Sequence, residues 1–124
     1  MSVHYDAGAL VAADRNDRAV WAEHRARLEL GLVPETTAPV IAQVSRSPRQ
    51  AQLRRFLRGC RIRPFPADDS HPVGALLAKA KTADVVDAHL ILGTADDDTV
   101  ITSDPEDVRR LAAALHRRIR IREI

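Results

Sequence analysis

Residues 83–107 read ADVVDAHLILGTADDDTVITSDPED, and this stretch decides the fold that we expect for the chain. Asp84 is a typical residue before a helix, and the apolar run Val85–Leu92 that follows predicts the helix itself. Val100–Thr102 is short, apolar and β-branched, which predicts a buried strand. The three aspartates between them, Asp96–Asp98, indicate a tight turn that faces solvent. A helix followed by a buried strand is the repeating unit of an α/β protein.

The rest of the chain continues the same alternation. Ser103 and Asp104 follow the strand directly, and Pro105 favours the first turn of another helix. The other expected elements are strands at Val3–Tyr5, Leu32–Thr37 and Ile62–Phe65, helices at Ala7–Ala13, Arg18–Leu30, Pro39–Ser45, Ser47–Arg58, Val73–Ala80 and Asp107–His116, a polar turn at Pro66–Pro72, and an edge strand in the tail RRIRIREI. Strands separated by helices predict a three-layer α/β/α sandwich with a mainly parallel central sheet, in a single domain over residues 1–124.

Composition is that of an ordinary soluble protein. Hydrophobic residues make up 45% and charged residues 29% of the chain, and no apolar run is long enough to cross a membrane. No signal peptide is expected, and the single cysteine, Cys60, cannot form an internal disulfide, so the sequence predicts a cytoplasmic protein. The net charge is +2, but the basic residues are almost all arginine. This composition is compatible with a nucleic-acid ligand and equally with an arginine-rich genome.

Several carboxylates occupy positions where a strand ends or a helix begins. Asp6 ends the first expected strand, and Asp104 follows the strand Val100–Thr102. Asp87 lies in the first turn of the helix that starts after Asp84. Functional groups gather beyond the carboxyl ends of strands in open α/β sheets, so these side chains can converge. Because clustered carboxylates repel one another unless a cation neutralises them, and Mg²⁺ or Mn²⁺ prefers oxygen ligands, the pattern predicts a divalent-metal site.

Helix capping explains part of the same pattern. Asp84 is a good N-cap, and Asp87 is then the third helical residue, where the helix dipole favours an acid. The dipeptide Asp104-Pro105 is a helix start in its own right. Asp6 precedes Ala-Gly and has no evident capping role, so we interpret it as the strongest indication of a metal site.

No motif of another common active site is present. The sequence has no nucleophile elbow, no paired cysteines and no glycine-rich phosphate loop. A phospho-acceptor domain needs an acidic pair after the first strand and an aspartate after the third, but Asp6 is followed by Ala7 and Phe65 by Pro66. The histidines lack the spacing of metal ligands, and each is expected on the surface or in the core: His4, His24, His71, His89 and His116.

Four segments, in order, resemble a known family. They are YDAGALVAA at Tyr5–Ala13, TAPVIAQVSR at Thr37–Arg46, DVVDAHLILGTA at Asp84–Ala95 and VITSDPEDVRRLA at Val100–Ala112. Together they look like a PIN domain, and their order and spacing are most similar to the VapC toxins of VapBC toxin–antitoxin modules. The resemblance covers essentially the whole chain.

The resemblance implies an α/β/α sandwich and cleavage of RNA that depends on Mg²⁺ or Mn²⁺. By position, Asp6, Asp87 and Asp104 match acidic catalytic and metal-binding residues of the family, and Asp84 is a further acidic residue beside them. Ions held there would activate water to attack a phosphodiester. The resemblance also implies a VapB-type antitoxin as partner, whose C-terminal tail covers the site, and a homodimer.

One position departs from the family pattern. The second acidic residue of the family, usually a glutamate, falls at Gln43, which offers a carbonyl oxygen but no charge. Either Asp84 compensates and the chain is a nuclease with weaker metal binding, which we favour, or it is a weak or inactive PIN-like module that binds RNA or protein. Arg46, one turn beyond Gln43, is a candidate to hold the scissile phosphate, or else an exposed helical residue. Thr102 and Ser103 are candidates for hydrogen bonds to the acidic ligands.

Overall fold

A five-stranded parallel sheet forms the centre of the molecule. The computed structural model describes residues 1–124, and the strand order is β3-β2-β1-β4-β5. The strands are β1 (Val3–Tyr5), β2 (Glu35–Thr37), β3 (Arg61–Arg63), β4 (Thr99–Thr102) and β5 (Arg120–Glu123). Every neighbouring pair is parallel, as expected, and Tyr5 of β1 lies opposite Ile101 of β4. The strand ends that carry Asp6 and Asp104 are therefore neighbours at the carboxyl edge of the sheet.

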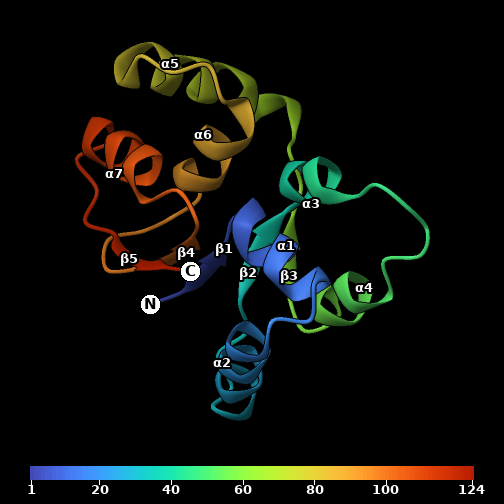
Figure 1. Cartoon of the computed structure of the whole chain (residues 1–124). Helices are drawn as coiled ribbons and strands as arrows, with labels where there is room; N and C mark the ends of the chain where they lie inside the picture. The colour runs from blue at the N-terminus through green and yellow to red at the C-terminus, as the bar shows by residue number, and fades with distance from the viewer.

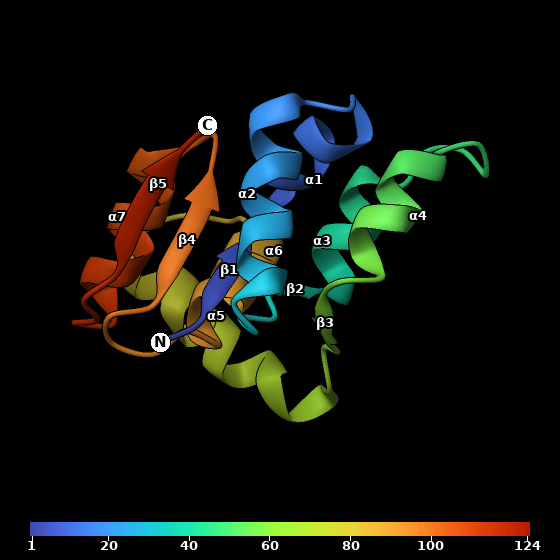
Figure 2. The same ribbon diagram turned by 90° about the horizontal axis from the view of Figure 1, so that it is seen from below.

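Helices cover both faces of this sheet (Figure 1, Figure 2). They are α1 (Ala7–Asp14), α2 (Arg18–Glu29), α3 (Ala38–Val44), α4 (Ala51–Leu57), α5 (Ser70–Ala80), α6 (Val85–Leu92) and α7 (Pro105–Ala114), and a 3-10 turn, η1 (Ala67–Asp69), precedes α5. Alternate residues of a strand face opposite sides of a sheet. Accordingly, Ile101 packs in a core with α1 to α4, and Val100 packs in a second core with α5 to α7. The expected three layers are confirmed.

Two helix starts differ from the sequence prediction. The helix expected from Ser47 begins at Ala51, because the side-chain oxygen of Gln50 accepts hydrogen bonds from the backbone N–H groups of Arg46 (2.7 Å) and Ser47 (3.1 Å). These bonds close residues 46–50 into a loop before the helix can start. In the opposite sense, α5 begins at Ser70, inside the segment expected to be a turn. No helix in the structure combines the length and apolar character needed to cross a membrane.

The turn expected to be solvated buries one of its three aspartates. Asp98 is only 4% exposed, and its carboxylate accepts hydrogen bonds from the backbone N–H groups of Ser2 (2.7 Å) and Ala95 (2.9 Å). It also contacts His4 Nε2 at 2.9 Å. The prediction is wrong for Asp98 because the N-terminus of the chain folds over this turn and brings unpaired donors to it. Asp98 thus ties β1 to the start of β4 at the amino edge of the sheet.

Two arginines hold the C-terminal end of α6. Arg63 of β3 donates to the carbonyl oxygen of His89 at 2.8 Å, and Arg117 donates to that of Leu92 at 3.2 Å. Gly93 lets the Arg63 guanidinium lie close to the backbone, because a Cβ there would overlap the guanidinium and displace it. Cations at a helix C-terminus complement its dipole. These contacts fix the axis of α6, whose N-terminal end lies at the carboxyl edge of the sheet.

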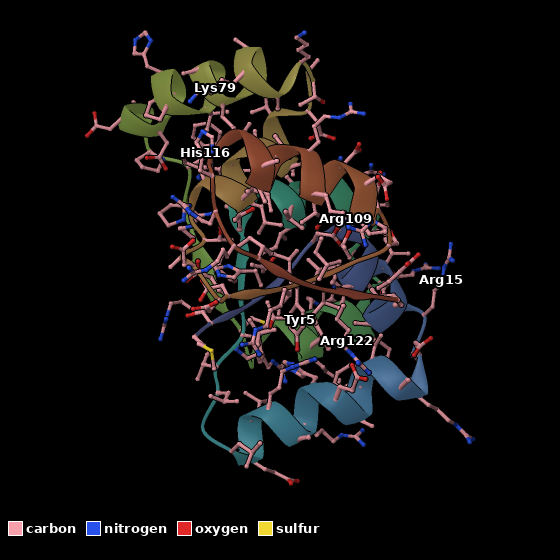
Figure 3. All side chains as sticks on the ribbon, turned by 90° about the vertical axis from the view of Figure 1, so that its left-hand side faces the viewer. Tyr5, Arg15, Lys79, Arg109, His116 and Arg122 are labelled. Atoms are coloured by element: carbon pink, nitrogen blue, oxygen red, sulfur yellow. The ribbon has the colours of Figure 1, made fainter.

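Both edges of the sheet carry the same Arg-Ile-Arg sequence. On β3, Arg63 lies 3.4 Å from the carboxylate of Glu35 on the neighbouring strand. On β5, the predicted edge strand, Arg122 pairs with Glu23 of α2 (Figure 3). Each edge strand therefore carries two arginines, of which Arg63 on β3 and Arg122 on β5 make the closest contacts with an acid.

Candidate metal centre

Asp6 connects the end of β1 to the start of α1. Its Oδ1 accepts hydrogen bonds from the backbone N–H groups of Gly8 (2.9 Å) and Ala9 (3.4 Å), so Asp6 is the N-cap of α1. The sequence interpretation that Asp6 has no capping role is therefore wrong, because the Ala-Gly that follows is the first turn of the helix. Burial raises the pKa of the Asp6 carboxyl, while hydrogen bonds from Thr102, Ala9 and Gly8 act in the opposite direction.

Asp104 shows the converse behaviour. It precedes α7, as predicted, yet its exposed side chain makes no capping hydrogen bond to that helix. Its backbone N–H instead donates to Thr102 Oγ1 at 2.8 Å. Thr102 is fully buried and also bonds Asp6, so one hydroxyl positions both strand ends. The carboxylate of Asp104 therefore caps no helix.

Asp84 and Asp87 lie together at the start of α6. Asp84 Oδ1 accepts a hydrogen bond from the Asp87 backbone N–H at 2.9 Å, which confirms the predicted N-cap. The pKa of Asp87 is raised to about 7, first by burial and then by the negative charges of Asp84, Asp6 and Asp107. Asp84 belongs to the same helix start, whereas Asp6 and Asp107 come from two other parts of the chain, and their negative charges add to the effect of burial.

Asp107 is an acidic neighbour that the sequence reasoning did not include. A hydrogen bond with Asp104 is the main cause that raises the pKa of the Asp107 carboxyl, followed by burial and by the charges of Asp104 and Asp84. The signal was present in the sequence: Asp104 and Asp107 are three residues apart at the start of a helix and therefore share a face. We had interpreted Asp107 only as a helix-start residue.

The accessory candidates lie apart from this cluster or at its border. Gln43 and Arg46 are exposed, and the Arg46 guanidinium donates to the carbonyl oxygen of Ser45 at 2.8 Å, at the end of its own helix. Ser103 is exposed and lies against Gly8, where any side chain would overlap it. A surface hollow of about 520 Å³ begins at these two residues and follows α1 as far as Arg15. Of the four aspartates, Asp104 is exposed, Asp84 and Asp87 are half-buried, and Asp6 is buried.

The donor set suits a hard divalent cation, although it is not assembled as a ligand set. No three His, Cys, Asp or Glu side chains in the structure form a group that could hold a metal ion as they stand. The aspartates contribute only carboxylate oxygens, which Mg²⁺ and Mn²⁺ prefer. Their mutual repulsion is visible in the raised pKa of Asp87 and is the condition that a cation relieves. The chemistry of these residues therefore fits a divalent ion.

The histidines take the places expected of core and surface residues. His4, His24 and His89 are buried, whereas His71 and His116 are exposed. None of the three buried rings makes a hydrogen bond with the aspartates at the carboxyl edge. His89, for example, contacts Asp69 at 3.2 Å.

Comparison with known proteins gives one informative result. No family model matches the chain, and no curated protein matches it in sequence. Among solved structures, the crystal structure of VapBC2 from Rickettsia felis bound to a DNA fragment from their promoter superposes with a TM-score of 0.72. The match covers 99% of this chain and 100% of the other, at 16% sequence identity. The fold is PIN-like. The resemblance expected from the sequence is thus confirmed for the fold. In this PIN-like chain, the aspartates lie at the carboxyl edge of the sheet.

Proposed function

We propose that the chain is a metal-dependent endoribonuclease and the toxin component of a VapBC-type toxin–antitoxin module. The observation that carries the proposal is the convergence of Asp6, Asp84, Asp87 and Asp104 around one end of α6, with Asp107 beside them. Surface aspartates with no function rarely gather in this way, because each added carboxylate raises the free energy of the others. The full-length likeness to VapBC2 supports the choice of activity.

Asp6, Asp87 and Asp104 are the residues that would hold the ion, and Asp84 and Asp107 would add negative charge around it. A bound Mg²⁺ or Mn²⁺ supplies an activated water and neutralises charge on the phosphodiester. Asp104 suits this role best, since its carboxylate has no capping bond to break. Asp6 can still offer Oδ2 while Oδ1 caps α1.

The protein itself contributes rigid placement. Thr102 holds the Asp6 side chain and the Asp104 backbone together, and the two strands are hydrogen-bonded in register. Arg63 and Arg117 fix the other end of the helix that carries Asp87. Functional groups on strand ends and helices supported in this way keep their separations when side chains rotate toward an ion.

Cleavage of RNA by the purified chain tests the proposal. Total cellular RNA is incubated in EDTA, in Mg²⁺ and in Mn²⁺, beside an Asp104→Asn variant. Discrete fragments that need the ion and disappear in the variant are expected. Intact RNA with every ion, from a protein shown by circular dichroism to be folded, would exclude the nuclease.

A second function is favoured by one observation. Gln43, at the position where the family has an acid, is exposed on α3 and makes no hydrogen bond with the aspartates. A PIN-like module that binds RNA or a protein without cleaving it would need no fourth acid. Tight RNA binding without cleavage in either ion would favour this alternative.

Partners follow from the same proposal. The VapC-type resemblance implies an antitoxin of the VapB type, a homodimer and action in the cytoplasm. Coexpression with the antitoxin from the neighbouring gene should restore growth that the toxin alone prevents, and Asp104→Asn should be harmless without it.

A further inference from the structure

Acidic and basic residues are strongly separated along this chain. No aspartate or glutamate occurs between Thr36 and Ala67, and all the charged residues there are arginines: Arg46, Arg49, Arg54, Arg55, Arg58, Arg61 and Arg63. The net charge of +2 conceals this separation. A segment with one sign of charge creates a local field that attracts the opposite sign.

Most of these arginines have no acidic partner. Arg61 and Arg63 pair with Glu35, but the other five lie beyond ion-pair distance of every carboxylate. Asp14, on the neighbouring helix α1, accepts a hydrogen bond from the Gln50 side chain at 3.0 Å. By contrast, three arginines of α7 and the β5 side do have acidic partners: Arg109 with Glu106, Arg118 with Asp97 and Arg122 with Glu23.

The unpaired charges form one stripe on α4. Leu53 and Phe56 are the buried side of the helix, while Arg54, Arg55 and Arg58 are exposed at spacings of three and four residues. Side chains with that spacing lie on one helix face. Arg49, in the loop that precedes the helix, is exposed as well.

An arginine of α2 extends the stripe through an aromatic ring. The guanidinium carbons of Arg25 and Arg55 lie 5.8 and 5.7 Å from the centre of the Trp21 ring. The ring is fixed, because Trp21 Nε1 donates to the Ala13 carbonyl oxygen at 3.0 Å. Two like charges are thus held on one ring with no acid between them, an arrangement that an anion would stabilise.

We propose that this face, formed by Arg25, Arg49, Arg54, Arg55 and Arg58 and named here the α4 arginine face, holds the phosphates of the RNA that the aspartates cleave. The inference rests on the ribonuclease function proposed above. Helix α4 packs against α1, whose first turn carries Asp6. Figure 1 shows α4 on one side of α1, with α6 and α7 on the other. An RNA held on α4 therefore needs to cross only α1 to reach the aspartates.

The α4 arginine face is expected to contact the RNA backbone and not the bases. Tyr5, Trp21 and Phe56 are buried, and Phe65 is stacked on His89 with ring centres 4.3 Å apart. No aromatic side chain is left to stack on a base, so affinity comes from arginine–phosphate contacts and is independent of base sequence.

RNA binding in EDTA tests the inference without cleavage. Fluorescence anisotropy of labelled oligouridine and oligoadenine of equal length is measured with the full chain and with Arg49→Gln/Arg54→Gln/Arg58→Gln. Arg55 is left intact because it supports Trp21. The matched control, Arg109→Gln/Arg118→Gln/Arg122→Gln, removes the same charge from α7 and the β5 side, where Figure 3 labels Arg109 and Arg122.

The α4 variant is expected to lose affinity about 10- to 50-fold for both oligomers near physiological salt, and its log–log salt slope should fall by about 2. The control should stay within a factor of about three of the wild type, because its arginines are already neutralised by acids. Equal losses in both variants, unchanged affinity in the α4 variant, or no RNA binding by the wild type would each overturn the inference. So would a face that binds polyglutamate in preference to RNA, which would assign it to an acidic protein segment.

The two proposals fail separately. If the α4 variant loses RNA binding and no form cleaves RNA in Mn²⁺, the α4 arginine face is supported and the nuclease function is excluded. If the wild type cleaves RNA and the α4 variant binds RNA as the wild type does, the nuclease function is supported and the role of the face is excluded.

Discussion

The two edges of the sheet use the same side chain in opposite ways. At the amino edge, burial opposes ionisation of Asp98, but hydrogen bonds from Ser2, Ala95 and His4 outweigh it and lower the pKa of its carboxyl. At the carboxyl edge, burial and then the charges of neighbouring acids raise the pKa of Asp87 to about 7. At the amino edge, hydrogen-bond donors of the protein stabilise the negative charge of Asp98. At the carboxyl edge, several carboxylates lie together and no ion pair with a cationic side chain of the protein neutralises them.

Under the proposed function, this difference separates a structural aspartate from one that would hold an ion. Each partner of Asp98 belongs to the chain itself, so the interaction stabilises the fold. The aspartates at the carboxyl edge repel one another and lower stability, which a protein tolerates where a ligand supplies the missing charge. An Asp→Asn substitution at each edge should therefore give opposite results.

The largest effect is expected for Asp104→Asn. Its carboxylate is exposed and caps no helix, so the free energy of unfolding should change by less than about 0.5 kcal/mol. RNA cleavage in Mn²⁺ should fall at least about 100-fold, the upper end of what loss of a supporting partner costs at a metal site. Urea unfolding and a cleavage time course measure the two quantities. Retained cleavage would remove Asp104 from the site.

Asp98→Asn should give the reverse result. The amide replaces one of the two oxygens with a donor, so either the bond from Ser2 to Oδ1 or that from Ala95 to Oδ2 is lost, which should lower the free energy of unfolding by about 2 kcal/mol. Urea denaturation measures this change. Cleavage per folded molecule should be unchanged, since Asp98 lies at the far edge of the sheet. A stable variant with no activity would mean that the two edges are not independent.

Thr102→Val tests how the carboxyl edge is positioned. The substitution keeps the shape of a buried residue but removes the hydroxyl that bonds Asp6 and accepts the Asp104 N–H. We expect about 10-fold less cleavage and a higher Mn²⁺ concentration for half-maximal activity, with about 1 kcal/mol of lost stability. Ser at this position should restore most of the activity. A purely structural role predicts an unchanged Mn²⁺ requirement.

The smallest expected effect is on how the free energy of unfolding depends on pH, measured in EDTA. The dependence should have opposite signs for the aspartates at the two edges. Folding raises the pKa of Asp87 from 3.8 to about 7, so its folded form binds more protons and the protein loses stability as pH rises across that window. Asp87→Asn should therefore stabilise the protein at pH 8 by about 1 kcal/mol after solvent screening, and the gain should vanish near pH 4.

Asp98 has a lowered pKa, so its contribution is present above about pH 4 and is lost as pH falls further. The loss of stability caused by Asp98→Asn should thus shrink in acid, where the gain in stability from Asp87→Asn has already disappeared. Urea midpoints at a series of pH values compare the two variants. Parallel curves would contradict the assignment of opposite roles.

Sequence patterns identified the fold because the signals were local and repeated. Strand–helix alternation, Pro105 after Asp104 and the apolar helix after Asp84 were all read in the correct order, and the parallel sheet followed from them. The start of α4 was misplaced, because Gln50 bonds the loop before it, a contact that no propensity scale contains.

The individual roles of the acids could not be read in the same way. Sequence reasoning took Asp6 as free of capping, although it caps α1, and treated the Asp104 pattern as explained by a helix start, although its carboxylate makes no cap. The burial of Asp98 depends on the N-terminus, far away in sequence. Which donor reaches which oxygen is decided by tertiary packing, so the type of residue predicts a candidate site but not the role of each member.

The repeated Arg-Ile-Arg sequence on β3 and β5 has a consequence for how copies of the molecule can meet. An exposed strand edge is a template on which another chain can add, and a growing stack of such additions ends in an insoluble fibre. Here both edge strands carry two arginines, and β5 adds one acid, Glu123, so two free edges that meet bring mostly positive charge together. Growth of the sheet from one molecule into the next is thereby opposed at both ends.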